Sequence, residues 1–142
     1  MNAKTRIGPA LQQAYLETDY QVHDHRPFVL KIGVASPQLA QLYRQHGSTC
    51  ATFLTACNPH SEAVDDVENL AFQHKLAREL TRLGLTFIPG IGQDSQGQCP
   101  GEPSYLILGR ALDEAKVMGT QYRQNALVWC GEDAVPHLIL LR

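Results

Sequence analysis

The amino-acid sequence predicts an α+β domain, in which helices pack on a mixed sheet of about five or six strands. Short apolar runs rich in β-branched and aromatic residues alternate with longer segments whose apolar residues recur at helical spacing. The 142 residues are 44% hydrophobic and 18% charged, which is ordinary for one globular domain. Because neither a repeat nor a linker divides the chain, we expect a single domain over residues 1–142.

The first part of the chain predicts two helices and one strand. A helix is expected over residues 9–18, where a proline suits the first turn and apolar residues follow at helical spacing. The apolar run 28–32 lies between a proline and a glycine, which predicts a strand. Ser36 followed by Pro37 is typical of a helix start, and Gly47 is the expected end of that helix.

The middle of the chain predicts one parallel strand–helix–strand unit over residues 51–88. Residues 50–56 carry no charge, which suits a strand covered on both faces. A helix is expected over 64–83 with Gly84 as its end, and a strand over 85–88 follows, so the unit should be right-handed. The apolar stripe of this helix is expected to comprise Val67, Leu70, Ala71, His74, Leu76, Ala77, Leu80 and Leu83.

The last part of the chain predicts a long loop, a short helix and three strands. Residues 89–101 contain Gly, Gln, Ser and Pro in no regular pattern, which indicates a loop of functional length. A strand over 105–108 and a helix over 111–119 follow. The apolar runs 126–130 and 137–141 flank a turn-rich segment and predict a hairpin.

Composition limits the classes of function. A formal net charge of −2 and a pI near 6.3 argue against a nucleic-acid partner. We find no signal peptide and no apolar run of the roughly 18 residues that a membrane span needs, so we expect a cytoplasmic protein. A local basic groove is the alternative for nucleic-acid binding, and its residues would be Arg44, Lys75, Arg78, Arg82 and Arg123.

The cysteines give no sign of a metal site. Cys50, Cys57, Cys99 and Cys130 form no Cys-x-x-Cys pair, and no histidine pair stands nearby at zinc-finger spacing. In a reducing compartment the default is buried free thiols, so we expect four free cysteines and no bound metal.

Four polar segments are expected to meet at one edge of the sheet. Residues 58–61 and 90–92 follow the two strands of the parallel unit, whose carboxyl ends share an edge. If the strand 105–108 runs antiparallel to the strand 85–88, residues 102–104 reach this edge. If the helix 111–119 then makes a crossover, residues 122–125 also lie there. A cleft formed by these segments would suit a small polar or anionic ligand. An anion would face the helix start near Asp65, unless the acidic residues of that first turn already satisfy it.

Several side chains of these segments are candidates for a site. Glu102, just ahead of an apolar strand, and His60, which titrates near neutrality, are candidates for a general acid or base. The amides of Asn58 and Gln124 could orient a polar ligand. Each of these residues also has an alternative without a role at a site. Asn58 could be a turn residue and His60 an exposed surface residue. Glu102 could be a solvated charge at a strand end, and Gln124 a buried structural amide. We expect Asn69 and Ser104 to form hydrogen bonds. Asn69 could contact the ligand or, alternatively, tether the 58–61 loop.

Five short motifs occur in a specific order along the chain. They are TACNPHS at 55–61, EN at 68–69, EPSYLILG at 102–109, YRQNA at 122–126 and VW at 128–129. Together they resemble the bacterial domain of unknown function family 3293, over nearly the whole chain from about residue 14. This resemblance implies a small stand-alone bacterial domain without an established activity, cofactor or catalytic residue. The positions that it emphasises are Asn58, Pro59, Ser61, Asn69, Glu102, Ser104, Gly109 and Gln124.

The chain departs from the pattern of this family at three positions. A tryptophan is usual where Cys57 and Cys99 stand, and a glycine where Arg123 stands. Smaller side chains at the first two positions could open the cleft. We predict that the thiols of Cys57 and Cys99 lie close together in space.

Two functions follow from these observations. The first is a small-molecule or nucleotide-binding enzyme with a polar cleft around Asn58, Glu102 and Gln124. The second is a non-catalytic protein-interaction module in which the same residues form a structural hydrogen-bond network. Burial and the presence of a cavity beside these residues separate the two. The sequence identifies no cofactor and no oligomeric state.

Overall fold

A single curled sheet of seven strands forms the centre of the computed structural model, which describes residues 5–97 and 101–142. The strands are β1 (Asp19–Val22), β2 (Phe28–Leu30), β3 (Ala51–Leu54), β4 (Phe87–Gln93), β5 (Glu102–Leu108), β6 (Ala126–Cys130) and β7 (Pro136–Leu140). The α-helices of the described residues are α1 (Pro9–Glu17), α2 (Pro37–His46), α3 (Asp66–Arg82) and α4 (Leu112–Gln121). A short 3-10 helix, η1 (Pro59–Ser61), precedes α3.

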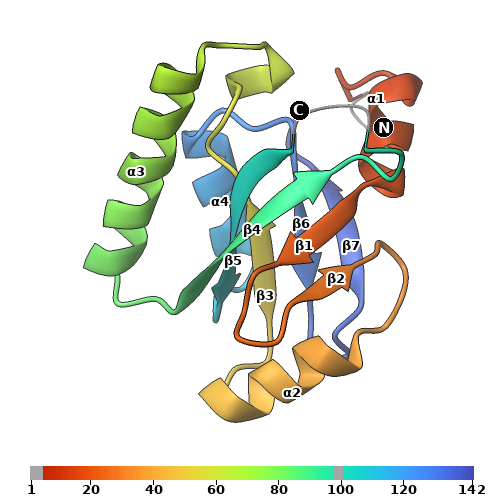
Figure 1. Cartoon of the computed structure of the whole chain (residues 1–142), viewed down its shortest axis with the longest axis vertical. Coiled ribbons are helices and arrows are strands. Elements are labelled where there is room, and N and C mark those ends of the chain that lie inside the picture. The colour runs from red at the N-terminus through yellow and green to blue at the C-terminus, as the bar shows by residue number, and fades with distance from the viewer. Residues whose placement is uncertain (1–4, 98–100) are drawn as a thin grey trace.

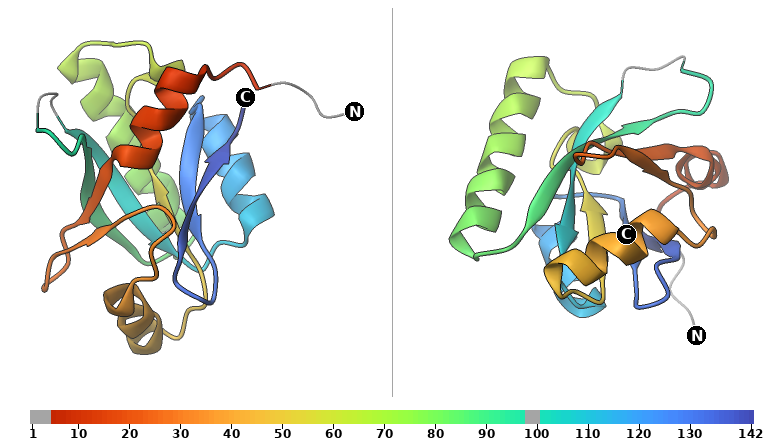
Figure 2. Two further views of the ribbon diagram at one scale, coloured as in Figure 1. Left: turned by 90° about the vertical axis from the view of Figure 1, so that its right-hand side faces the viewer. Right: turned by 60° about the horizontal axis from the view of Figure 1, so that its bottom comes forward.

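The strands follow the order β2-β1-β4-β5-β3-β6-β7, and every neighbouring pair is antiparallel. The sheet curls into a half-barrel (Figure 2). In Figure 1, α2 lies below the strands and α1 lies at the upper end. Helices α3 and α4 pack on the outer, convex face of the sheet and therefore do not fill its inner, concave face.

The α+β class is as predicted, but the expected mixed sheet of five or six strands with a parallel unit is wrong. β3 and β4 run in the same direction, yet β5 lies between them and pairs with both. Its residues Leu106, Ile107 and Leu108 are all buried, which favours a central position for β5. A crossover helix produces the same sequence pattern whether its two strands are adjacent or separated by one.

Two strand segments differ from the expected elements. β1 was not expected as a strand, because it is short and has only two apolar residues, Tyr20 and Val22. In the structure both of these side chains are buried. The expected loop 89–101 begins as strand, since β4 continues to Gln93. β1 and β4 pair over their whole shared length, so tertiary pairing holds a glycine-rich segment extended. Sequence patterns do not reveal such pairing.

Several predicted element boundaries are confirmed. Ser36 caps α2, because its Oγ accepts a hydrogen bond from the backbone N–H of Leu39 at 3.1 Å. Gly47 ends that helix with a φ of 66°. β6 and β7 form the predicted hairpin. Within the described residues, no helix is both long enough and apolar enough to cross a membrane.

The apolar core has two parts, one on each face of the sheet. The inner cluster joins the sheet to α2 through residues that include Leu30, Leu39, Leu42, Phe53, Leu106 and Val128. The outer cluster joins the sheet to α3 and α4 through residues that include Leu54, Leu76, Leu80, Ile107, Met118 and Leu127.

The predicted apolar stripe of α3 is only partly buried. Leu76 and Leu80 are inaccessible, whereas 79% of Val67 and 58% of Leu70 are exposed. Only the C-terminal half of α3 therefore covers the sheet. Gln73 is buried at the boundary, where its Oε1 accepts a hydrogen bond from the backbone N–H of Ala56 at 2.8 Å.

Candidate functional site

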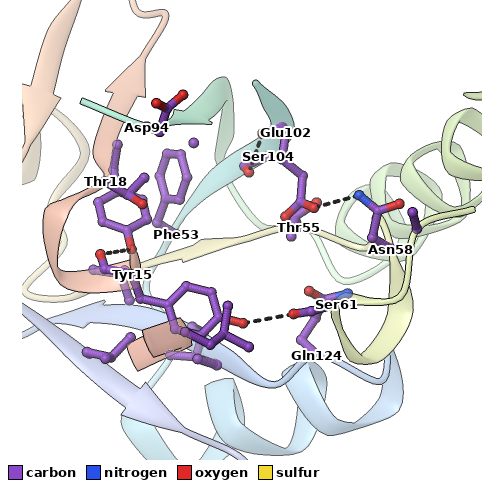
Figure 3. Close-up of a pocket in the computed structure, with 18 residues that line it drawn as sticks. Tyr15, Thr18, Phe53, Thr55, Asn58, Ser61, Asp94, Glu102, Ser104 and Gln124 are labelled. Carbon is purple, nitrogen blue, oxygen red and sulfur yellow. Dashed lines mark hydrogen bonds between the residues drawn. The ribbon is translucent and has the colours of Figure 1, made fainter. Parts of the chain in front are cut away.

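A cavity of about 310 Å³ opens at the end of the half-barrel where β3 and β4 end and β5 and β6 begin. Part of its lining is apolar and comes from β3, β6 and β7, through Phe53, Val128 and Leu138. The rest is polar, and Figure 3 shows these side chains around one space. The polar residues of the lining are Tyr15, Thr18, Tyr20, Thr55, Asn58, Ser61, Asp94, Glu102, Ser104 and Gln124.

Of the seven candidate residues, Asn58, Ser61, Glu102, Ser104 and Gln124 line this cavity, whereas Asn69 and His60 do not. The alternation of an antiparallel sheet explains why these residues meet. The ends of β3 and β4 lie beside the starts of β5 and β6, because each of those pairs is antiparallel. The polar segments therefore converge although the parallel unit does not exist.

The side chain of Asn58 joins the 58–61 loop to α3 and β5. Its Nδ2 donates to Oε2 of Glu102 at 2.9 Å. Its Oδ1 accepts from Nδ2 of Asn69 at 2.9 Å and from the backbone N–H of Val64 at 3.1 Å. The backbone N–H of Asn58 donates to Oδ1 of Asn69 at 2.8 Å. Asn69 thus tethers the loop to α3.

The backbone of the 58–61 loop is strained at three residues. Asn58, His60 and Ser61 have φ angles of 46°, 56° and 59°, in the left-handed region that L-residues rarely adopt. Such a conformation costs about 1–2 kcal/mol for most residues and less for asparagine. A hydrogen bond of 2.6 Å from the backbone N–H of His60 to the carbonyl of Arg123 helps to hold the loop.

Ser61 connects this loop to α1 and to the start of β6. Its Oγ lies 2.9 Å from the hydroxyl of Tyr15 and accepts from Nδ2 of Asn125 at 2.9 Å. Oδ1 of Asn125 in turn accepts from Nη1 of Arg142 at 3.1 Å. A chain of hydrogen bonds therefore joins two residues of the cavity wall, Tyr15 and Ser61, to Arg142 through Asn125.

Replacing Asn58 separates the two features that hold this loop. Asn58→Gly removes the side-chain hydrogen bonds but permits the positive φ, so we expect a loss of about 1 kcal/mol in unfolding free energy. Asn58→Ala adds the left-handed strain, for a total loss of about 2 kcal/mol. Chemical denaturation of both variants measures this difference. If alanine were tolerated as well as glycine, the strain would not contribute.

Glu102 has the most unusual environment among the carboxyl groups at the cavity. It is half-buried, and this burial raises the pKa of its carboxyl above the ordinary value. The hydrogen bond from Asn58 acts in the opposite direction on the pKa and fixes Oε2. Among the described residues, no donor reaches Oε1, so this oxygen is available to a molecule in the cavity.

Gln124 and Ser104 line the cavity in different ways. Nε2 of Gln124 donates to the carbonyls of Cys57 and Tyr122, each at 3.1 Å, and no described residue donates to its Oε1. Oγ of Ser104 donates to the backbone carbonyl of Glu102 at 3.0 Å. No base contacts this hydroxyl among the described residues, and the interaction that the structure shows for it is this hydrogen bond.

Several residues of the lining were not recognised from sequence patterns. Tyr15 lies on the predicted first helix, where its helical spacing indicated only packing. Thr18 and Tyr20 belong to the α1–β1 region, and β1 itself was not predicted. Thr55 directly follows β3, whereas the uncharged run 50–56 predicted that it lies within the strand. Asp94 follows β4, whose true end was unknown.

The described cysteines are free thiols, as expected for Cys50, Cys57 and Cys130. Burial raises the pKa of the Cys57 thiol, which lies 3.7 Å from the carbonyl of Pro103. Cys99 lies outside the described residues, so its predicted proximity to Cys57 stays a prediction. Within residues 5–97 and 101–142, no three His, Cys, Asp or Glu side chains are grouped so as to hold a metal.

The fold and the cavity define a small α+β domain with a polar pocket at one end of an antiparallel half-barrel. The chain belongs to the family described as "Protein of unknown function (DUF3293)", whose model matches residues 54–127. That segment contains all five candidate residues that line the cavity but excludes Tyr15 and Tyr20. Neither a curated protein nor a solved structure matches the chain.

Proposed function

We propose that the protein is a small-molecule-binding enzyme whose ligand occupies this cavity. The observation that carries the proposal is the carboxyl of Glu102, which is half-buried, held at one oxygen by Asn58 and open to the cavity at the other. A desolvated carboxyl with a raised pKa is characteristic of acid–base catalysts. Asn58 and Gln124 would orient the ligand on either side of it.

The proposed chemistry is a proton transfer. The carboxylate of Glu102 would accept a proton through Oε1 from a heteroatom of the ligand, and the carboxyl would then pass this proton to water. The hydrogen bond from Asn58 Nδ2 would stabilise the carboxylate during this exchange. A positioned acid or base of this kind contributes about 10²–10⁴-fold to a reaction rate. His60 does not line the cavity, so we assign the role to Glu102.

The size of the cavity supports a small ligand. Ligand pockets usually have volumes of about 300–1,000 Å³, and about 310 Å³ is at the lower end of that range. The described residues of the lining include no lysine, arginine or histidine that could pair with phosphates. Both observations favour a small metabolite over a nucleotide.

A thermal-shift screen against common metabolites and nucleotides tests this proposal. At a concentration of 100 times its Kd, a ligand adds about 2.7 kcal/mol to the unfolding free energy, which corresponds to roughly 8–10 °C for a domain of this size. We expect small metabolites to raise the Tm of the wild type and to have a smaller effect on Glu102→Gln. Glu132→Gln is the matched control, since Glu132 is exposed in the turn between β6 and β7, at their opposite end.

One observation favours a non-catalytic interaction module instead. Asn58, Asn69 and Glu102 form one hydrogen-bonded network, which is what a structural role requires. The screen separates the two functions. A Tm that no compound changes, in the wild type or in Glu132→Gln, would remove the support for an enzyme and favour the module.

A further inference from the structure

The polar side chains of the cavity use most of their hydrogens on the protein itself. The hydroxyl of Tyr20, for example, donates to the carbonyl of Tyr15 at 2.6 Å, and burial raises the pKa of this phenol, so its proton stays in place. Four further side chains of the lining also donate hydrogen bonds to the protein, at distances of 2.7–3.1 Å. These bonds run from Thr18 to Ala14, from Thr55 to Pro103, from Ser104 to Glu102, and from Gln124 to Cys57 and Tyr122. Every acceptor in these bonds is a backbone carbonyl.

What these side chains present to the cavity is therefore mainly lone pairs. Gln124 is only 7% exposed, and its Oε1 has no donor among the described residues. Oε1 of Glu102 is likewise open. The hydrogens that remain are one on Nδ2 of Asn58 and one within the Tyr15–Ser61 pair. A ligand that covers these oxygens must supply most of the donors, because an acceptor that becomes buried without a donor is costly.

Among the described residues that line the cavity, all charged side chains have one sign. The described residues of its lining include the carboxyl groups of Asp94 and Glu102 and no cationic side chain. The positive end of the α3 dipole does not offset this negative charge, because acidic side chains already occupy the start of the helix. Asp65 caps it by accepting a 2.7 Å hydrogen bond from the N–H of Glu68, and further acids lie in its first turn. The anionic ligand considered from the sequence is thus disfavoured.

We infer that the cavity recognises an organic ammonium compound, whose amine donates to Glu102 and Gln124 while its apolar part packs against Phe53, Val128 and Leu138. This inference rests on the proposed small-molecule site and specifies its ligand class. An ammonium group brings three donors and a positive charge, which matches the open acceptors of Glu102 and Gln124 and the carboxyl of Glu102. The aromatic pair of Tyr20 and Phe53, with ring centroids 5.3 Å apart, adds a surface that tolerates a cation.

Binding of an amine should be coupled to the protonation of Glu102. Burial raises the pKa of this carboxyl in the free protein, whereas a cation beside it favours the carboxylate. Ammonium binding would therefore release a proton wherever the carboxyl is still protonated. Affinity should rise as the pH increases through the pKa of Glu102 and level off above it.

Three compounds with the same apolar chain and different head groups test the inference: n-hexylammonium, n-hexanol and n-hexanoate. Each is titrated into ¹⁵N-labelled full-length protein, and the side-chain amide signals of Asn58 and Gln124 are followed by NMR. We expect n-hexylammonium to bind at least about tenfold more tightly than the other two, a difference of about 1.4 kcal/mol. We also expect its affinity to increase with pH.

The matched variants localise the effect. Glu102→Gln keeps an acceptor for Asn58, so the fold should persist, but the preference for n-hexylammonium should fall at least about tenfold. Glu132→Gln removes one negative charge elsewhere and should retain the preference. Equal or tighter binding of n-hexanol or n-hexanoate would overturn the ammonium inference and leave the small-molecule site standing. If none of the three compounds shifts these signals, the inference fails, and the metabolite screen decides separately on the site.

Discussion

Gly90→Ala is expected to destabilise the protein by about 3 kcal/mol, because overpacking in a well-packed core costs about 1–3 kcal/mol and a backbone clash lies at the upper end. A Cβ at this position would lie 2.3 Å from the carbonyl oxygen of Gln21 and 2.9 Å from Cε2 of Phe53. The strand cannot move away easily, since Gly90 is paired with Val22 on one side and Ser104 on the other. The Tm should fall by about 10 °C.

Gly92→Ala is the matched control in the same strand. Its Cβ would meet only Cγ2 of Thr18, at 3.8 Å, which is an ordinary contact. We expect a change in unfolding free energy within about 0.5 kcal/mol. Similar melting temperatures for the two variants would contradict the close packing of β1, β3 and β4 around Gly90. The Gly90-Ile-Gly92 sequence thus has a packing reason at its first glycine, and a phosphate-binding role is not needed to explain it.

Glu102→Gln is expected to lower turnover by about 10²–10⁴-fold, as for the loss of a general acid or base, and yet to stabilise the protein at neutral pH. The folded-state pKa of Glu102 is raised by burial, so the folded protein binds this proton more tightly than the unfolded chain does. The wild type therefore loses stability as the pH rises from the ordinary glutamate pKa of 4.5 through the raised value. Glutamine carries no charge and avoids this loss.

The difference in Tm between Glu102→Gln and the wild type should consequently be small in acid and grow more positive toward neutral pH. Each 1 kcal/mol of stabilisation corresponds to roughly 3–4 °C for a domain of this size. Thermal unfolding across this pH range provides the measurement, and Glu132→Gln controls for the loss of one negative charge. A variant that becomes less stable than the wild type as the pH rises would show that Glu102 is a structural ion and not a desolvated acid.

The sequence predicted most helices correctly because their ends carry specific chemistry. Ser36 and Gly47 bound α2 through a side-chain cap and a left-handed backbone. The order of the sheet could not be predicted, because the placement of β5 between β3 and β4 depends on long-range pairing. The exposed Val67 shows the same limit, since periodicity defines a helix face without stating how far the sheet extends beneath it.

The candidate site was predictable where polar residues border buried strands. Asn58, Glu102 and Gln124 were predicted to meet at one edge through a parallel unit, an antiparallel return and a crossover. In the structure they line one cavity because the neighbouring strands are antiparallel, so that the ends of β3 and β4 lie beside the starts of β5 and β6. Tyr15 and Tyr20 could not be found in this way. Their role at the cavity depends on how α1 and β1 close the half-barrel, which no local pattern encodes.

Carbon-13 NMR of the Glu102 carboxyl, followed from about pH 3 to about pH 9 and assigned with Glu102→Gln, is the most direct test of the proposed site. A desolvated carboxyl that faces the cavity should titrate with a midpoint above the ordinary glutamate value of 4.5. Its signal should also respond when n-hexylammonium is added, with the midpoint moving lower. A midpoint at or below 4.5 that n-hexylammonium leaves unchanged would contradict both the burial of this group and its place in a ligand site.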